Sequence, residues 1–377
     1  MEVRKDRPIR LTGSRAWRTY LGGKLLEQFH GELTGEDGHF PEEWIASLVE
    51  ARNAGREELT EGLSMLSDRP SVSLKELIES DPAGFLGEAH AAQLGPTLGV
   101  LVKLIDSAER LAVQVHPDKE KAWKLFHSEY GKTECWHILG GREIRGETPC
   151  VYLGFRPGVT PEHWKDCFFR QDIKAMLECL HRFEVEKGDT ILIEGGVPHA
   201  IGAGCFLVEI QEPTDYTIRV ERVTASGYQV ADSMCHQGLG FERMFECFHY
   251  ENYSEEEARK RWFIPAKLIK EERKNRFLRL VGYEETPCFC MEMVEVRDTM
   301  SLEQDGCSAV YVLEGCGKLL SGRENSTEGA DGQEEVRQGD QFFLPAGIQE
   351  LRLLAEEGSC LKLIRCFGPY TGGQSGF

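Results

Sequence analysis

Two stretches decide the fold of this 377-residue chain: residues 188–199, GDTILIEGGVPH, and residues 339–350, GDQFFLPAGIQE. They align without a gap. Each has Gly-Asp, then an apolar run, then a second glycine eight residues after the first. This pattern is typical of a turn, a buried strand and a tight glycine turn that redirects the next strand, as in a small antiparallel jelly roll. Two copies therefore predict two jelly-roll barrels.

The rest of the chain adds strands and a helical stretch to this plan. Trp44, Ile45 and Leu48 lie at helical spacing, and Ser73 with Glu76 forms a capping-box pattern. From about residue 98 onward, short apolar runs typical of strands dominate. We therefore predict a mainly β protein of two jelly-roll barrels with a helical insertion. Its expected parts are N-terminal strands in 1–40, a helical segment in 41–95, a first barrel in 96–250, a helical connector in 251–275 and a second barrel in 276–377.

The composition argues against several classes of partner. The chain has 44 Lys and Arg against 63 Asp and Glu, a net charge of −19, which repels nucleic-acid backbones and anionic lipid. We expect no secretory leader and no membrane span, because no apolar run approaches the required length of about 20 residues. The 13 cysteines include no Cys-x-x-Cys pair, which favours reduced thiols in a cytoplasmic protein over disulfides or thiolate–metal sites. A small anionic ligand is compatible with this charge, because it needs only a local positive site.

Polar residues that could hold a metal ion gather in the first barrel. Strand alternation points Gln114 and His116 to the same face, and His199 follows the glycine turn of the first repeat. Glu134 adds a carboxylate from a third segment. Two imidazoles, a carboxylate and an amide oxygen suit a divalent cation with open positions for water or substrate. The same donors also describe a non-haem iron oxygenase, so the residues alone leave the chemistry open.

The second barrel lacks this set of donors. The second repeat has Glu350 where the first has His199, and no His-x-His precedes it. We therefore expect the second barrel to be metal-free and structural, and the first barrel to be the catalytic, metal-binding one.

Three cationic residues are expected near the metal site. Lys132 lies two residues before Glu134 and therefore on the same strand face. Lys103 interrupts an apolar strand, where a charge is costly unless it is paired or functional. Arg219 lies between two apolar residues, so its side chain points either inward or onto a solvated strand face. An inward arginine suits a phosphate or an enediolate oxygen.

Five separated segments of the chain carry a further pattern: 114-QVHPD-118, 131-GKTECW-136, 198-PHAIG-202, 209-EIQ-211 and 217-TIRV-220. In this order, the segments resemble type I mannose-6-phosphate isomerases of the cupin superfamily. In addition, 17-WRTYLGGKLL-26 is similar to the opening strand and glycine turn of that family. The resemblance is dense from about residue 95 to 222, and looser across the helical segment and the C-terminal barrel.

This resemblance implies a zinc-dependent aldose–ketose isomerase that interconverts mannose 6-phosphate and fructose 6-phosphate through a cis-enediol(ate). It implies one Zn²⁺ per chain, with Gln114, His116, Glu134 and His199 as the ligands. The implied catalytic residues are Arg219, Lys132 and Glu209, and the implied substrate-binding residues are Lys103 and Arg219. The general base stays open between Lys132, Glu209 and a water on the metal.

Two departures from the family pattern bear on the substrate. Ala112 stands where the family more often has a serine, which removes a hydroxyl contact to phosphate. The sequence after Arg219, 220-VERVTASG-227, also differs from the common continuations. Two rival functions therefore stay open: an iron-dependent cupin oxygenase, and a non-catalytic protein that binds a sugar phosphate. The expected partner is a sugar phosphate, not nucleic acid or a membrane.

Overall fold

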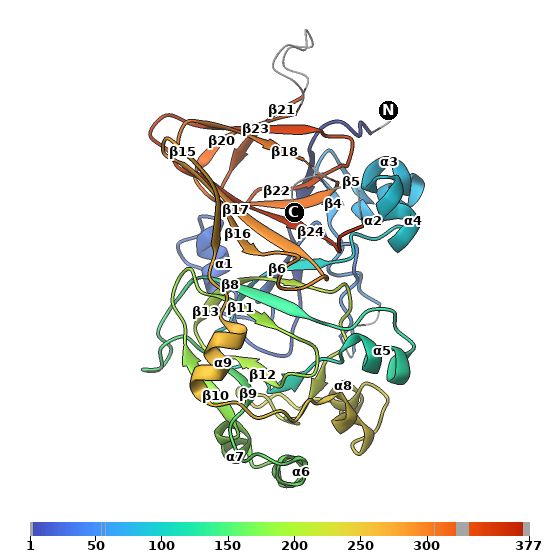
Figure 1. Cartoon of the computed structure of the whole chain (residues 1–377), viewed down its shortest axis with the longest axis vertical. Coiled ribbons are helices and arrows are strands. Elements are labelled where there is room, and N and C mark those ends of the chain that lie inside the picture. The colour runs from blue at the N-terminus through green and yellow to red at the C-terminus, as the bar shows by residue number, and fades with distance from the viewer. Residues whose placement is uncertain (1–2, 54, 57, 305, 322–331, 372–377) are drawn as a thin grey trace.

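The computed structural model describes residues 3–371 apart from 54, 57, 305 and 322–331. The described strands form four sheets, and every strand pairing in them is antiparallel. Figure 1 shows the sheets arranged as an upper and a lower group along the long axis of the molecule. The predicted mainly β fold class is therefore confirmed.

The lower group contains a six-stranded and a five-stranded sheet. In spatial order, the six strands are β11 (Thr190–Ile193), β8 (Glu134–Gly141), β13 (Cys205–Gln211), β6 (Leu101–Asp106), β3 (Glu42–Ile45) and β2 (Ser14–Ala16). The five strands are β10 (Leu180–Glu184), β9 (Cys150–Phe155), β12 (His199–Ile201), β7 (Gln114–Val115) and β14 (Ile218–Arg219).

The upper group contains a nine-stranded and a four-stranded sheet. The nine strands are β15 (Lys267–Glu272), β16 (Asn275–Val281), β17 (Cys290–Val296), β24 (Leu361–Phe367), β19 (Ser308–Glu314), β22 (Gln341–Leu344), β1 (Ile9–Thr12), β4 (Met65–Leu66) and β5 (Arg69–Ser73). The four strands are β18 (Thr299–Glu303), β23 (Glu350–Ala355), β20 (Cys316–Ser321) and β21 (Gln333–Arg337).

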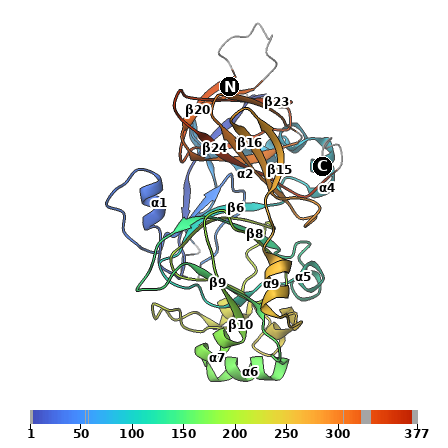
Figure 2. The ribbon, with the colours of Figure 1, turned by 60° about the vertical axis from the view of Figure 1, so that its left-hand side comes forward.

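Short helices surround the sheets (Figures 1 and 2). They are α1 (Lys24–Phe29), α2 (Leu74–Ser80), α3 (Pro82–Leu86), α4 (Glu88–Leu94), α5 (Lys119–Phe126), α6 (Pro161–Arg170), α7 (Ile173–Glu178), α8 (Asp232–His236), the 3₁₀ helix η1 (Arg243–Cys247) and α9 (Glu255–Trp262). None of the helices among the described residues is long and apolar enough to cross a membrane.

Each group of sheets has its own core, and a third core joins them. Trp136, from the six-stranded sheet, packs with Leu153, from the five-stranded sheet, inside the lower group. Val102 and Val208 point to the other face of the six-stranded sheet and belong to the same buried cluster as Phe343 of the upper group. Strands β6 and β13 are therefore buried on both faces, which explains their continuous apolar runs.

The repeat builds the same corner twice. In the first copy, β11 pairs with β8, and the chain then crosses to β12 in the facing sheet. In the second copy, β22 pairs with β19, and the chain crosses to β23 in the four-stranded sheet. Gly196 has a φ of +93°, and a Cβ there would meet the His249 ring at 2.5 Å, so the first turn requires glycine. The closure of each sheet pair into a complete barrel stays a prediction, as do the exact domain boundaries.

The predicted helical segment at 41–95 begins about thirty residues too early. Residues 42–45 form the strand β3 and residues 65–73 contain β4 and β5, whereas helices begin only at Leu74. In β3, Trp44 packs into one buried cluster and Ile45 into another. A strand buried on both faces lacks the alternation of apolar and polar residues that identifies strands. Its apolar residues were therefore interpreted as one face of a helix. The predicted capping box of Ser73 and Glu76 is confirmed, and Ser254 and Glu257 form a second capping box at the start of α9.

The N-terminal strands tie the two groups of sheets together. β1 pairs with β22 of the upper group, whereas β2 pairs with β3 of the lower group. The chain thus enters both sheets within its first sixteen residues. This places the segment around Arg18 and Tyr20 beside the interior of the lower group, where they line a cavity.

Candidate metal and substrate site

Three segments of the lower group bring two histidines and a glutamate together. His116 follows β7, Glu134 begins β8 and His199 begins β12, directly after the glycine turn. Their ligand atoms all lie within 4.8 Å of one another, and all three side chains are buried. This group, His116, Glu134 and His199, is called the His/Glu cluster below. The structure therefore assembles three of the four predicted metal ligands at one point.

The hydrogen bonds of the two histidines fix their tautomers. His116 Nδ1 lies 2.9 Å from the carbonyl oxygen of Tyr216, and His199 Nδ1 lies 2.9 Å from that of Val197. Because a carbonyl only accepts, each Nδ1 carries a proton, which leaves Nε2 as the ring atom that can bind a metal ion. These Nε2 atoms lie 3.1 and 3.2 Å from the Glu134 carboxylate. Burial, reinforced by the positive charge of Lys132, lowers the pKa of His116 to about 3, which keeps this imidazole neutral.

The His/Glu cluster has the donors and the vacant lone pairs that a divalent cation requires. Two imidazole Nε2 atoms face a carboxylate, and Glu134 Oε1 is buried without a hydrogen-bond partner among the described residues. Burial alone would raise the pKa of Glu134, but Lys132 and the histidines hold it well below its usual range. A buried carboxylate oxygen facing two lone pairs is stabilised by a cation placed between them. The residues therefore fit a metal ion.

Gln114 adjoins the His/Glu cluster across the strand ladder. It pairs with His199 between β7 and β12, and its Nε2 atom lies 3.3 Å from His199 Nε2. Amide oxygen and nitrogen exchange by rotation about one bond, so the same side chain can offer its oxygen as a donor. Its position agrees with the predicted ligand set, and its role as a ligand stays a prediction.

Lys132 supplies the positive charge at the His/Glu cluster. Its Nζ atom lies 2.8 Å from His116 Nε2 and 2.8 Å from Glu134 Oε2. Lys132 and Glu134 share a face of their segment, as strand alternation predicted. A lysine this close to the donors can also contact any ligand bound there.

Lys103 and Glu209 form a buried pair next to the His/Glu cluster. They face each other across β6 and β13, with Lys103 Nζ 3.0 Å from Glu209 Oε1 and 2.7 Å from Gln211 Oε1. The other oxygen, Glu209 Oε2, accepts from Trp136 Nε1 at 2.9 Å. Burial would lower the pKa of Lys103, but the nearby carboxylates raise it. Both side chains of the pair line the cavity above the His/Glu cluster.

Arg219 points inward, as one of the two sequence interpretations required. It lies on β14 opposite Gln114, and its Nη1 donates to the carbonyls of Thr217 and Met234 at 3.3 and 3.0 Å. Within the described residues, no ion pair or further side-chain hydrogen bond is present at its guanidinium. Burial lowers the pKa of Arg219, while Asp215 opposes that shift. The remaining N–H groups of its guanidinium are therefore available to donate hydrogen bonds to a ligand in the cavity.

A second buried network completes the cavity wall, and the sequence did not predict it. Glu42 accepts hydrogen bonds from Tyr20 at 2.9 Å and Trp44 at 2.8 Å, and pairs with Arg18 at 2.9 Å. Burial alone would raise the pKa of Glu42, but Arg18 and Lys103 hold it at about 2. Arg18 and Tyr20 stand in the N-terminal stretch that resembles the family. Glu42 was not predicted to line the cavity, because its strand was predicted to be helical.

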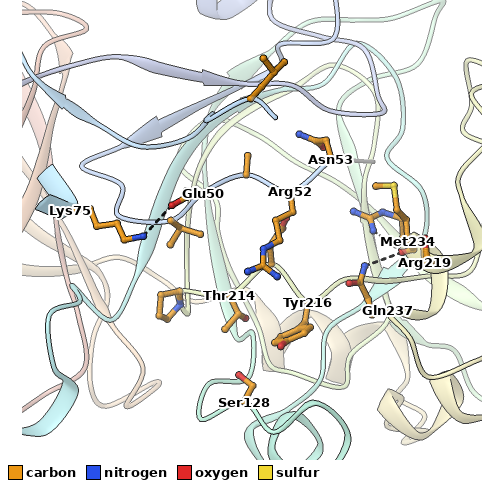
Figure 3. A pocket seen from close by; sticks show the side chains of 16 residues that line it. Glu50, Arg52, Asn53, Lys75, Ser128, Thr214, Tyr216, Arg219, Met234 and Gln237 are labelled. Carbon is orange, nitrogen blue, oxygen red and sulfur yellow. Dashed lines mark hydrogen bonds and ion pairs between the residues drawn. The ribbon is translucent and has the colours of Figure 1, made fainter. Parts of the chain in front are cut away.

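An open groove of about 770 Å³ lies next to the cavity. Asp215 and Arg219 line both the inner cavity and the groove, so the two adjoin each other. Figure 3 shows Arg52 extending into the groove toward the segment that carries Thr214 and Tyr216. Arg52 is exposed, and within the described residues no ion pair is present at its guanidinium. No sequence motif pointed to Arg52, because this residue lies outside every quoted segment.

All eight predicted site residues thus lie at one cavity or directly beneath it. Gln114, Lys103, Lys132, Glu209 and Arg219 line it, and the His/Glu cluster lies against Gln114 and Lys132. The fold and this cluster define a cupin-type protein with a candidate metal site.

The comparisons with known proteins narrow this class. A family model described as "Phosphomannose isomerase type I, catalytic domain" matches residues 60–133, a segment that contains Lys103, Gln114, His116 and Lys132. The mannose-6-phosphate isomerase ManA of Bacillus subtilis is 32% identical over 126 residues, which cover 33% of this chain and 38% of that protein. That of Streptococcus mutans is 32% identical over 126 residues, 32% of this chain and 35% of that protein. The matched segment thus spans little more than a third of these relatives.

Solved structures with the same fold cover nearly the whole chain. The mannose 6-phosphate isomerase of Bacillus subtilis has a TM-score of 0.69 at 22% identity, covering 96% of this chain and 99% of that one. A variant phosphomannose isomerase of Salmonella typhimurium has a TM-score of 0.70 at 14% identity, covering 97% and 100%. The chain is therefore similar to type I phosphomannose isomerases, in sequence around the candidate site and in fold throughout.

Proposed function

We propose that this protein is a zinc-dependent isomerase that interconverts mannose 6-phosphate and fructose 6-phosphate. One observation carries the proposal: the Nε2 lone pairs of His116 and His199 converge with the Glu134 carboxylate beneath a cavity lined by Lys132 and Arg219. Zinc is proposed because imidazole and carboxylate donors are its usual ligands. Gln114 would complete the set, and we expect one ion at the His/Glu cluster of each chain. A cytoplasmic location is part of the same proposal, since the substrate class is intracellular.

The reaction requires a proton to move between C2 and C1 of the open-chain sugar. When bound, the cation supplies Lewis-acid polarisation of the oxygens at these two carbons. Lys132 is the amine whose Nζ lies at the His/Glu cluster, 2.8 Å from Glu134, so we assign it the proton transfer. Glu209 is a poorer base, because both of its oxygens already accept hydrogen bonds from Lys103 and Trp136. We assign Glu209 a positioning role instead.

Arg219 and the groove would hold the rest of the substrate. The carbonyls of Thr217 and Met234 fix Nη1 of Arg219, which aims its free donors at the negative charge that develops on an enediolate. The phosphate would lie toward the open groove, where Arg52 extends without an ion-pair partner among the described residues. Arg52 thereby offsets the contact that Ala112 lacks. Lys103 would contact the sugar hydroxyls beside Glu209.

The test is isomerisation of mannose 6-phosphate before chelation, after chelation, and after zinc is restored. We expect fructose 6-phosphate to form, formation to stop with the chelator, and zinc to restore it. Turnover that is indifferent to chelation would contradict the role of the metal. Oxygen uptake by the iron-loaded protein would favour the oxygenase, and tight binding of mannose 6-phosphate by zinc-loaded protein without turnover would favour the non-catalytic alternative.

A further inference from the structure

A second group of metal-ligating side chains lies outside the set of residues that line the cavity. It consists of His163 and Cys167 on α6 and Cys179 at the end of α7. The α6–α7 hairpin lies at the lower end of the molecule, away from the upper sheets (Figures 1 and 2). Within the described residues, only this group and the His/Glu cluster bring three such side chains within 4.8 Å. The matched family segment ends at residue 133, before the first residue of this group.

Local structure brings these three ligands together. His163 and Cys167 are four residues apart on one helix, which places both side chains on the same face. The Thr160 hydroxyl caps the first turn by accepting from the His163 amide at 3.2 Å. The chain turns through Gln171 and returns as α7, whose last turn carries Cys179 into hydrogen-bonding contact with the Cys167 thiol. Eleven residues separate the two cysteines in the sequence, so their spacing matches no short metal motif.

The distances fit a tetrahedral cation. His163 Nε2 lies 3.8 Å from Cys167 Sγ. In a zinc site with bonds of about 2.3 Å to sulfur and about 2.05 Å to nitrogen, neighbouring ligand atoms lie about 3.5–3.8 Å apart. The ligand atoms of all three side chains lie within 4.8 Å of one another, so the group is compact enough for a tetrahedral site.

The surroundings indicate a site with one open side. Both cysteines are buried against Trp164, Phe168 and Met176, whereas His163 is exposed. An ion held here would meet apolar side chains inward and solvent outward, which leaves a fourth position for water. Burial raises the pKa of the Cys167 thiol, and that of the Cys179 thiol to about 12. Thiols of this kind are poor nucleophiles, which argues against a reactive cysteine at this place.

We propose that His163, Cys167 and Cys179 form a second metal site, for a thiophilic divalent cation such as Zn²⁺. Each thiol would bind as a thiolate and release one proton, and His163 would bind as a neutral imidazole. The ion would fasten α6 to the end of α7, and hence to β10, which starts at Leu180. This proposal is independent of the isomerase activity.

Cobalt distinguishes the two sites in the full-length protein. Co²⁺ bound to a thiolate has a charge-transfer absorption in the near ultraviolet, and the His/Glu cluster contains no sulfur. We expect the reduced wild-type protein to bind two metal ions per chain and to show this absorption. The C167S/C179S variant should bind one ion and lose the absorption, while H199A should bind one ion and retain it. C235S, which removes a buried cysteine on α8, is the matched control and should bind two.

A third variant guards against misfolding of the cysteine variants. H163A removes an exposed side chain, so its fold should be unchanged by circular dichroism. Its affinity for Zn²⁺ at this site should fall by at least about tenfold. Removing a residue that only hydrogen-bonds a metal ligand usually weakens metal binding by about tenfold or more, and removing a ligand itself should weaken binding further. The proposal would be overturned by wild-type protein with one ion and no thiolate absorption, by absorption that persists in C167S/C179S, or by an unchanged affinity in H163A.

Discussion

Replacing Lys103 by methionine should destabilise the fold by about 3–5 kcal/mol, because the change leaves the Glu209 carboxylate buried without its cation. The two side chains are almost fully buried, and their charged atoms lie 3.0 Å apart. At an effective dielectric constant of about 20, charges at that separation attract each other by about 5 kcal/mol. The hydrogen bond from Lys103 to Gln211 is lost as well.

The assay is urea unfolding at neutral pH, followed by tryptophan fluorescence, for K103M, E209Q and the double variant. Trp136 donates to Glu209, so a probe lies at the pair itself. The double variant should lose about 2 kcal/mol less than the sum of the single variants, since it leaves neither charge unpaired. The matched control is K267M, which breaks the exposed Lys267–Glu284 pair and should change stability by less than about 1 kcal/mol.

The reasoning would be refuted if K103M lost no more stability than K267M. It would also fail if the losses in K103M and E209Q were simply additive, since that would mean that the two buried charges do not interact.

Three further predictions concern the cavity. The pKa of Glu42 is about 2 in the folded protein and near 4.5 in the unfolded chain, so the ionised carboxylate contributes about 3 kcal/mol to the free energy of unfolding. This contribution is complete above pH 4.5 and is lost as the pH falls toward 2. E42Q should therefore flatten the decline of the urea midpoint from pH 6 to pH 2, and an equally steep decline would contradict the assignment. R219A should lower kcat by about 10²-fold or more while metal content stays unchanged, as turnover and metal analysis would test; a near-normal kcat would remove Arg219 from the reaction. R52A should raise KM for mannose 6-phosphate about tenfold with little change in kcat and should weaken inhibition by inorganic phosphate, and unchanged values of both would place the phosphate elsewhere.

The sequence predicted what depends on local pattern. The repeat at 188–199 and 339–350 predicted two strands and two corners, and both are present. Strand alternation correctly placed Lys132 on the same face as Glu134, where the two side chains are hydrogen-bonded. These relations are short in sequence or repeat a fixed pattern, so elementary strand geometry is enough to find them.

Long-range pairing decided the parts that the sequence did not predict. Glu42 reaches the cavity because β3 pairs with β6, sixty residues later in the chain, and no local signal marks that pairing. Arg52 stands in the groove because the loop after β3 folds over it. The α6–α7 hairpin was also missed, although Thr160 and Asp172 cap its helices, because each helix is too short to show a clear apolar period.

The most direct test of the central claim is zinc content and isomerase turnover measured on the same samples of wild type, H199A and H181N. His181 is a buried histidine that hydrogen-bonds the Tyr253 carbonyl, outside the cavity, so H181N controls for the loss of a buried imidazole. We predict that H199A loses both the zinc of the His/Glu cluster and the conversion of mannose 6-phosphate to fructose 6-phosphate, while H181N retains both. Wild-type turnover in H199A, or loss of activity with the zinc of this cluster still bound at the wild-type level, would contradict the account.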